Sequence, residues 1–173
     1  MTPDPAAPRA APPPGLWRRL ACFTYEGVLL FGVVMVTGLL YAIITRQNHA
    51  LVGQHGLQAV IFVVLGAYFV WFWTRSGQTL AMQTWQIRLL RRDGRPVGAR
   101  QAALRYLLAW MWFLPALAWL GVTGLKGTGP VLATVTAGVL TYAALARLHP
   151  RRQYLHDTLC GTELVFWPAP GKR

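Results

Sequence analysis

Four ionisable side chains of this 173-residue sequence have types and spacings that could do chemistry: Arg19, Glu26, His156 and Asp157. Glu26 follows Arg19 by seven residues, so two helical turns would place both on one face, about 10.5 Å apart along the axis. A carboxylate in an apolar segment usually faces a partner or a watery cavity, so Glu26 is a candidate for binding a proton or cation. The structural alternatives, which we favour, are an ion pair with Arg19 or a shallow carboxylate that reaches the interface.

Asp157 and its neighbour His156 also admit more than one use. Asp157 could cap a short helix, or form an ion pair with Arg19 or with an arginine between residues 75 and 105, or bind a cation with His156; we favour an ion pair. We predict that Arg19 and Asp157 lie close together at the cytoplasmic end of the first span, with Glu26 deeper on the same face. Cys160 adds only a second candidate metal ligand to His156, whereas protein zinc sites use three or four. The sequence has no nucleophile with a base at a useful spacing and no Gly-rich phosphate loop. We therefore expect no metal, no cofactor and no enzymatic activity.

The elements that must position these side chains are four apolar runs of 17 or 18 uncharged residues. At ~1.5 Å per residue each run crosses a hydrocarbon core of about 30 Å once a flanking turn is included. We expect spans at about 22–44, 57–74, 106–123 and 130–147. The predicted fold class is an all-α membrane protein, a bundle of four transmembrane helices with a small cytoplasmic β-like cap.

The basic residues indicate how the spans are oriented. Of the 17 Lys and Arg residues, 15 lie in the N-terminal segment, the segment between spans two and three, and the C-terminal end. The positive-inside rule then places both termini in the cytoplasm, in a multi-pass protein of the cytoplasmic (inner) membrane. The formal net charge of +12 would suit a nucleic-acid binder, but these residues gather at span ends, so we expect anionic lipid headgroups and no nucleic acid as partners. The candidate headgroup contacts are Trp17, Arg18, Arg75, Arg91, Arg92 and Arg105.

The chain divides into one domain and two tails. Residues 1–15 are rich in Pro and Ala and predict a disordered cytoplasmic tail, because such a stretch cannot form a helix. Residues 16–167 form the membrane domain, and residues 168–173 form a C-terminal tail. Within the domain, residues 85–90 alternate apolar and polar as a half-buried strand does, and residues 163–166 form a second short strand. Both lie on the predicted cytoplasmic side, so we expect them to pair.

Three further local features concern spans three and four. Residues 98–105 are polar and basic, which fits either an amphipathic lead-in to span three or a helix on the lipid surface. Pro115, in the middle of span three, predicts a kink. Small residues form a stripe on span four that we expect to pack within the bundle; they are Ala133, Ala137 and Thr141, with Thr134 and Gly138 alongside.

Three motifs occur in a fixed order along the chain. They are Trp17-Arg18-Arg19-Leu20-Ala21 before the first span, Gly77-Gln78-Thr79-Leu80 followed by Ile-Arg-Leu, and His156-Asp157 followed by Gly161-Thr162. Through them, the chain resembles the RDD family of small bacterial membrane proteins over about residues 16–166. That family is named for an arginine at the start of the first helix and two aspartates. The resemblance implies that Arg19 is this arginine, that Asp157 is the second aspartate, and that Glu26 replaces the first with one methylene more.

The resemblance implies little about activity, since a few members are linked with cation–proton exchange or solute tolerance and most have no established role. Two function hypotheses follow. In the first, the chain is a structural or accessory membrane protein, alone, as a homo-oligomer or with other membrane proteins. In the second, it is a small cation, proton or solute transporter that uses an intramembrane carboxylate. A wet, polar-lined cavity that reaches Glu26 would favour transport, and a dry packed bundle the accessory role. Spans two and three offer little polar lining beyond Gln58, which favours the accessory role.

Overall fold

The computed structural model describes residues 13–46, 54–145 and 154–168. Nearly all of the predicted N-terminal tail and of the predicted C-terminal tail lies outside the described residues, so both remain predictions. The chain forms the following elements in order: α1 Leu16–Thr45, α2 Gln54–Arg75, α3 Leu80–Thr84, β1 Ile87–Arg91, α4 Ala99–Ala109, the 3-10 turn η1 Trp110–Trp112, α5 Leu114–Thr123, α6 Thr128–Leu145, α7 Leu155–Leu159 and β2 Thr162–Phe166.

The helices confirm the predicted class of a mostly helical membrane protein. Three helices (α1, α2 and α6) are long and apolar enough to cross a membrane, and the bent pair of α4–η1 and α5 makes a fourth candidate span. Large apolar side chains cover the outside of α1: Val28, Phe31 and Ile44 are 65%, 67% and 78% exposed. Such continuous apolar exposure is rare in a soluble monomer and is what a lipid-facing helix presents.

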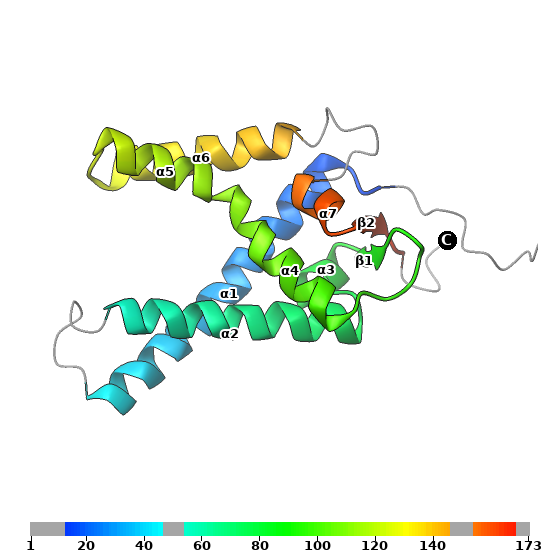
Figure 1. Ribbon diagram of the computed structural model, residues 1–173, viewed down its shortest axis with the longest axis horizontal. Coiled ribbons are helices and arrows are strands. Elements are labelled where there is room, and N and C mark those ends of the chain that lie inside the picture. The colour runs from blue at the N-terminus through cyan, green and yellow to red at the C-terminus, as the bar shows by residue number, and fades with distance from the viewer. Residues whose placement is uncertain (1–12, 47–53, 146–153, 169–173) are drawn as a thin grey trace, which may run out of the picture.

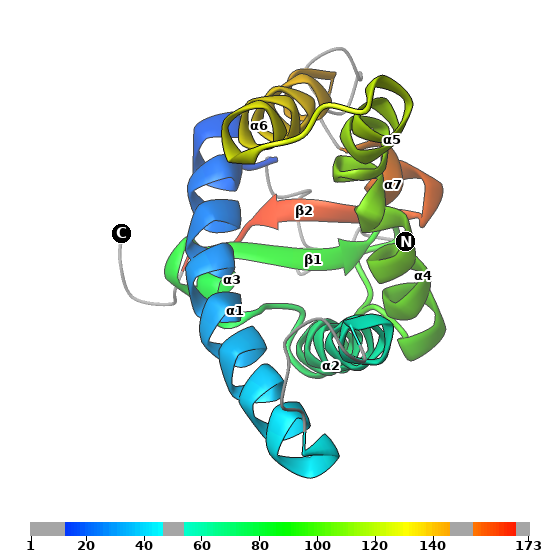
Figure 2. The ribbon, with the colours of Figure 1, turned by 90° about the vertical axis from the view of Figure 1, so that its left-hand side faces the viewer.

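The spans and the cap occupy opposite ends of the molecule (Figure 1). Helices α5 and α6 run side by side, α2 runs in a similar direction, and α1 crosses α2 obliquely. Figure 2, viewed along α2 and α6, shows the two strands between α1 on one side and α4 on the other. The short elements α3, β1, α7 and β2 thus form one cap, against which the ends of the long helices pack.

Span three bends where the sequence predicts a kink. The span is bent by 41° between its two parts, Ala99–Trp112 and Leu114–Thr123. The α-helical pattern ends at Ala109, tightens into the 3-10 turn, and resumes at Leu114, so that Pro115 lies in the first turn of α5. Proline has no N–H to donate and its ring crowds the carbonyl four residues earlier, whereas a first helical turn tolerates both losses. The break therefore precedes the proline.

Helices α5 and α6 form an antiparallel hairpin, but the packing stripe on α6 is shifted by one residue from the predicted position. Ala133 and Ala137 are exposed, whereas Thr134 and Gly138 are half-buried. A Cβ added at Gly138 would lie 2.8 Å from the Cβ of Ala116 on α5. The absence of a side chain at Gly138 lets the helices approach closely, as small residues do in membrane bundles.

The cap contains the predicted two-stranded sheet. Strands β1 and β2 pair antiparallel, from Ile87 opposite Phe166 to Arg91 opposite Thr162, which confirms the expected pairing. Gly77 lies beside this sheet, and its carbonyl accepts a hydrogen bond of 2.8 Å from Leu89 N. At φ +72°, with the Leu89 carbonyl 2.8 Å from where a Cβ would be, Gly77 occupies a position that favours glycine on both counts.

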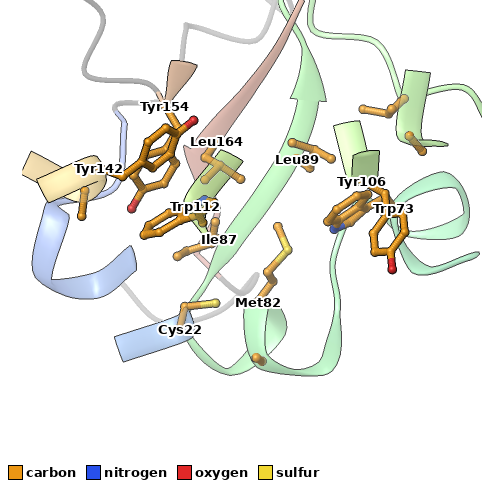
Figure 3. Packing of buried hydrophobic residues seen from close by; sticks show 14 residues of the cluster. Cys22, Trp73, Met82, Ile87, Leu89, Tyr106, Trp112, Tyr142, Tyr154 and Leu164 are labelled. Carbon is orange, nitrogen blue, oxygen red and sulfur yellow. The ribbon is translucent and has the colours of Figure 1, made fainter. Parts of the chain in front are cut away.

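The buried core lies where the cap meets the helices (Figure 3). On one side Trp112, Tyr142 and Tyr154 pack together, with the ring of Trp112 inclined to both tyrosines and its centroid 5.0 and 4.9 Å from theirs. On the other side lie Tyr106 and Trp73. Four aliphatic or sulfur-containing side chains fill the space between the two aromatic groups: Met82, Ile87, Leu89 and Leu164. This core fixes the cap on the helix ends and so positions the ionisable side chains.

Candidate functional site

Asp157 lies at the centre of the ionisable residues, on the short helix α7. Its carboxylate Oδ1 accepts a hydrogen bond from Arg105 Nε at 2.7 Å, and the two side chains are 0% and 8% exposed. Arg105 is on α4, whose buried face also carries Ala102 and Tyr106. The guanidinium carbon of Arg105 lies 4.3 Å from the centroid of the Trp73 ring of α2. The ion pair therefore joins α7 to α4, and the stacking of Arg105 on Trp73 joins α4 to α2.

The ion-pair partner of Asp157 is Arg105, so the prediction that Asp157 pairs with Arg19 is wrong. Arg19 is not within salt-bridge distance of Asp157 among the described residues and acts on it only at longer range. The expectation that Arg105 contacts lipid headgroups is wrong, because the residue is 7% exposed and its charge is directed inwards. The lipid-surface alternative for residues 98–105 fails for the same reason, since α4 packs against α2.

The surroundings of Asp157 favour its ionised form. Burial by itself raises the pKa of this carboxyl, but the Arg105 guanidinium, together with His156 and the more distant Arg19, outweighs burial and holds the pKa below its usual value. The hydroxyl of Thr162, at the start of β2, lies 3.3 Å from both the backbone oxygen and Oδ1 of Asp157. Asp157 thus holds β2, through Thr162, as well as α4, through Arg105.

His156 is held neutral and in one tautomer. The hydroxyl of Tyr142 accepts a hydrogen bond from the backbone N–H of His156 at 3.2 Å and lies 2.9 Å from its Nδ1. Because that hydroxyl accepts from the backbone N–H, we assign its own O–H as the donor to Nδ1, which places the ring proton on Nε2, 3.6 Å from Asp157 Oδ1. Burial lowers the pKa of His156 to about 4, a shift that Asp157 opposes only in part. His156 therefore orients and packs at neutral pH.

Arg19 faces the same core from α1. Its Nε donates a hydrogen bond of 2.9 Å to the carbonyl of Pro14, and its guanidinium carbon lies 5.3 Å from the centroid of the Tyr154 ring. Burial, which the Arg19 charge only partly offsets, raises the pKa of Tyr154 to about 12. Arg19 is only 5% exposed, yet its Nη2 has no hydrogen-bond partner among the described residues.

Glu26 connects three helices. Its Oε1 accepts a hydrogen bond from the Tyr68 hydroxyl of α2 at 2.8 Å, and its Oε2 accepts one from the hydroxyl of Thr79. Thr79 is the N-cap of α3, where its side chain also accepts from Met82 N. Glu26 is 8% exposed, so it is not a shallow interfacial carboxylate. Among the described residues Glu26 does not pair with Arg19, because its two oxygens accept hydrogen bonds from the hydroxyls of Tyr68 and Thr79.

The remaining headgroup candidates differ in exposure. Trp17 is 81% exposed, and Arg75, Arg91 and Arg92 are also exposed, so their contact with lipid stays a prediction. Arg18 is half-buried: its guanidinium carbon lies 4.3 Å from the centroid of the Phe166 ring, against the cap. Among the described residues, no group of three His, Cys, Asp or Glu side chains could hold a metal ion.

A cavity of about 360 Å³ lies between α1, α2, α4 and the cap. Its lining includes Arg19, Glu26, Arg105 and His156, whereas most of the other lining residues are apolar or aromatic. This is neither the wet, polar-lined cavity that would favour transport nor a fully dry packed bundle. It is an apolar cavity with charged groups at its cap end.

Sequence reasoning identified the two acidic residues but missed the donors that hold them. Arg105 was predicted to contact lipid headgroups. Its spacing from Ala102 and Tyr106, three residues before it and one after it, places all three on one helical face, and this pattern could have indicated that Arg105 is buried. Thr79 belongs to a motif that the sequence singled out, but nothing in that motif indicated a bond to Glu26. Nothing in the sequence around Tyr68 indicated that its hydroxyl would bind Glu26.

Comparison with known proteins supports the assignment that these motifs suggest. The sequence profile of the RDD family matches residues 13–161, which is most of the chain. No curated protein and no solved structure matches it. The matched region contains Arg19, Glu26 and Asp157 with the buried groups around them, and the apolar helices are those of a membrane protein. This chain belongs to the RDD family.

Proposed function

We propose that this RDD-family protein has a structural or accessory role in the cytoplasmic membrane, without catalytic activity. One observation carries the proposal: both buried carboxylates are used to join elements. Asp157 binds Arg105 and thereby ties α7 to α4, and Glu26 accepts from Tyr68 and Thr79 and thereby ties α1 to α2 and α3. Ionisable groups that hold a fold together in this way need no substrate to account for them.

The character of the cavity favours this role over transport. A carrier of protons or cations needs a polar path to the carboxylate that binds its cargo. The cavity beside Glu26 is lined mostly by apolar residues, and both oxygens of Glu26 are already bonded to hydroxyl groups. The guanidinium of Arg19 at the same cavity would also repel a cation.

The charge distribution supports the location that we propose. With 15 of 17 basic residues in the two terminal segments and the segment before span three, both termini and the cap would lie in the cytoplasm, against anionic lipid headgroups. The apolar exposed side of α1 would face acyl chains, a second copy of the chain or another membrane protein. The protein would not bind nucleic acid.

Flux measurements in proteoliposomes test the proposal. The purified chain, reconstituted with a proton gradient and with Na⁺ or K⁺ inside, should give the same proton and cation leak as protein-free vesicles. Glu26→Gln should leave this leak unchanged but lower the melting temperature in detergent, since it removes the charge from two hydrogen bonds. Glu163→Gln, the same change on half-buried β2, should affect stability less. Flux through the native chain that Glu26→Gln abolishes would refute the accessory role.

Cysteine accessibility tests the proposed orientation. A cysteine at Thr128, the first residue of α6, should react in intact cells with a membrane-impermeant maleimide, whereas a cysteine at the exposed Arg95 of the cap should react only after lysis. Both native cysteines are buried, so the unsubstituted chain supplies the background. Labelling of Arg95→Cys in intact cells would place the cap outside.

A further inference from the structure

The cavity described above has a shape and size suited to a ligand. Its volume of about 360 Å³ lies in the range of about 300–1,000 Å³ that is usual for small-molecule sites. It is partly open, and α1 contributes both a buried and an exposed part of its wall: Arg19 and Cys22 are buried, whereas Phe23 and Gly27 are exposed. The cavity therefore opens along the exposed face of α1, which is the face that lipid would cover.

One end of this cavity offers a free cationic donor. Arg19 is 5% exposed and lines the cavity, and its Nη2 is a buried nitrogen without a hydrogen-bond partner in the described residues. Its Nε is already bound to the Pro14 carbonyl, and Tyr154 covers the face of the guanidinium. A buried donor on a full positive charge is costly to leave unpaired, so this nitrogen is where an anion would be stabilised most.

The other charges around the cavity are already compensated. Arg105 is paired with Asp157, and His156 is neutral above a pKa of about 4. Glu26, seven residues beyond Arg19, lies about 10.5 Å away along the helix axis, and its two oxygens accept from hydroxyl groups. An anion at Arg19 would therefore meet a guanidinium that forms no ion pair among the described residues, with the nearest lining carboxylate two helical turns away.

The remainder of the cavity suits a hydrocarbon chain. Leu30, at the far end on α1, is eleven residues from Arg19, or about 16 Å along the axis, which is half of the ~30 Å hydrocarbon core and so the depth of one leaflet. Leu65 and Phe113 line this part, and the ring of Phe23 stacks on Trp112 with centroids 5.0 Å apart. An apolar chain would replace no polar contact here.

We propose that this cavity binds an anionic single-chain amphiphile, whose carboxylate or phosphate head lies on Arg19 Nη2 and whose acyl chain runs along α1 towards Leu30. The head would lie at the cap end of the helix, where headgroups are expected, and the tail at hydrocarbon depth. The ligand would enter sideways from the membrane past Phe23 and Gly27.

Tryptophan quenching tests the proposal on the full chain in a non-ionic detergent, because Trp73, Trp110 and Trp112 line the cavity. The probes are brominated palmitate, brominated lysophosphatidate and, as the uncharged match, brominated hexadecanol. The native chain should bind at least one anionic probe about tenfold or more tightly than the alcohol, since a charged hydrogen bond is gained. The tighter anionic probe identifies the head group. Inorganic phosphate should displace neither the palmitate nor the lysophosphatidate probe, because it has no acyl chain to fill the apolar part of the cavity.

Two pairs of matched variants locate the site. Arg19→Gln should remove the preference for the anionic probe while leaving alcohol binding unchanged, whereas Arg18→Gln, the same change at a residue outside the cavity, should keep it. Gly27→Leu should weaken all three probes by filling the mouth, whereas Gly32→Leu should not. A Cβ added at either glycine meets no atom within 4 Å, so both leucine variants are expected to fold.

Several results would overturn the proposal. Equal affinity of the native chain for palmitate, lysophosphatidate and hexadecanol would mean that Arg19 does not select an anion. Displacement of the probes by inorganic phosphate would indicate an ion site without an amphiphile. If Arg19→Gln lowers the melting temperature too far for binding to be measured, the Gly27→Leu and Gly32→Leu pair decides, and equal binding by these two would refute the cavity as the site.

Discussion

The buried ion pair between Arg105 and Asp157 should be the most costly polar contact to break in this protein. The perturbation is a double-mutant cycle of Asp157→Asn, Arg105→Met and the double variant. Asparagine keeps the shape of Asp157 and an acceptor for Thr162, and methionine keeps much of the apolar stem that packs beside Trp73. Each single variant therefore removes one charge and leaves the other buried.

The burial of the pair sets the expected magnitude. With Nε and Oδ1 2.7 Å apart and side chains 8% and 0% exposed, neither charge can be compensated by water once its partner is gone. Each single variant should lower the free energy of unfolding by about 3–5 kcal/mol, and the double variant should lose about 2–3 kcal/mol less than the sum. The surface pair of Arg91 and Asp93, 3.3 Å apart with exposures of 46% and 43%, supplies the control: Asp93→Asn should cost under about 1 kcal/mol.

The assay is unfolding by SDS in mixed micelles at pH 7, followed by circular dichroism. At this pH Asp157 is ionised in both states, because its pKa is lowered in the folded protein from an ordinary value near 3.8. Its contribution is therefore fully present at pH 7 and is lost only as the pH falls below about 3.8. Additive losses in the cycle, or a cost of Asp157→Asn no larger than that of Asp93→Asn, would show that the pair does not stabilise the fold as argued.

Three further outcomes are expected. Folding holds His156 neutral, with a pKa of about 4 against 6.5 unfolded, so stability should fall by up to about 3 kcal/mol as pH drops from 6.5 to 4, and unfolding titrations of His156→Gln should lack this slope. Tyr68→Phe, which loses a 2.8 Å hydrogen bond to a buried carboxylate, should cost about 1.5–3 kcal/mol in the same titration, whereas Tyr25→Phe on the exposed side of α1 should cost little. Gly138→Ala should destabilise by about 1–3 kcal/mol, because its Cβ would lie 2.8 Å from a Cβ of α5. Gly32→Ala, in open space, should be neutral or slightly stabilising, and equal effects of the two substitutions would contradict the close packing of α5 and α6.

Those parts of the fold that depend on local pattern could be predicted from the sequence. Uncharged runs long enough to cross a bilayer gave the spans, and alternation over residues 85–90 gave the position of β1 and its pairing with β2. The bend near Pro115 follows from the chemistry of one residue. The packing stripe of α6 was misplaced by one position, because small residues occur on two adjacent faces and only the contact with α5 selects between them.

The site was less predictable, because its contacts join residues far apart in sequence. Asp157 was predicted to pair with Arg19, but it pairs with Arg105, because the choice of partner depends on how α4 packs against α2 and α7. Thr79 reaches Glu26 across 53 residues, and Tyr68 does so across 42. No periodicity within one element carries information on such contacts, so the sequence indicates the acid and not its donor.

The register of the sheet imposes an order on biosynthesis. Paired residues of β1 and β2, such as Arg91 and Thr162, are more than seventy positions apart. At about 5–20 residues per second, β1 waits between about 4 and 16 seconds for its partner strand to leave the ribosome. During that interval one edge of β1 lacks its ladder and Arg105 lacks its counter-ion. A nascent chain that stops before Asp157 would have all four candidate spans and an Arg105 without its counter-ion, so the ion pair and the β1–β2 ladder can form only after residues 157–166 have been synthesised.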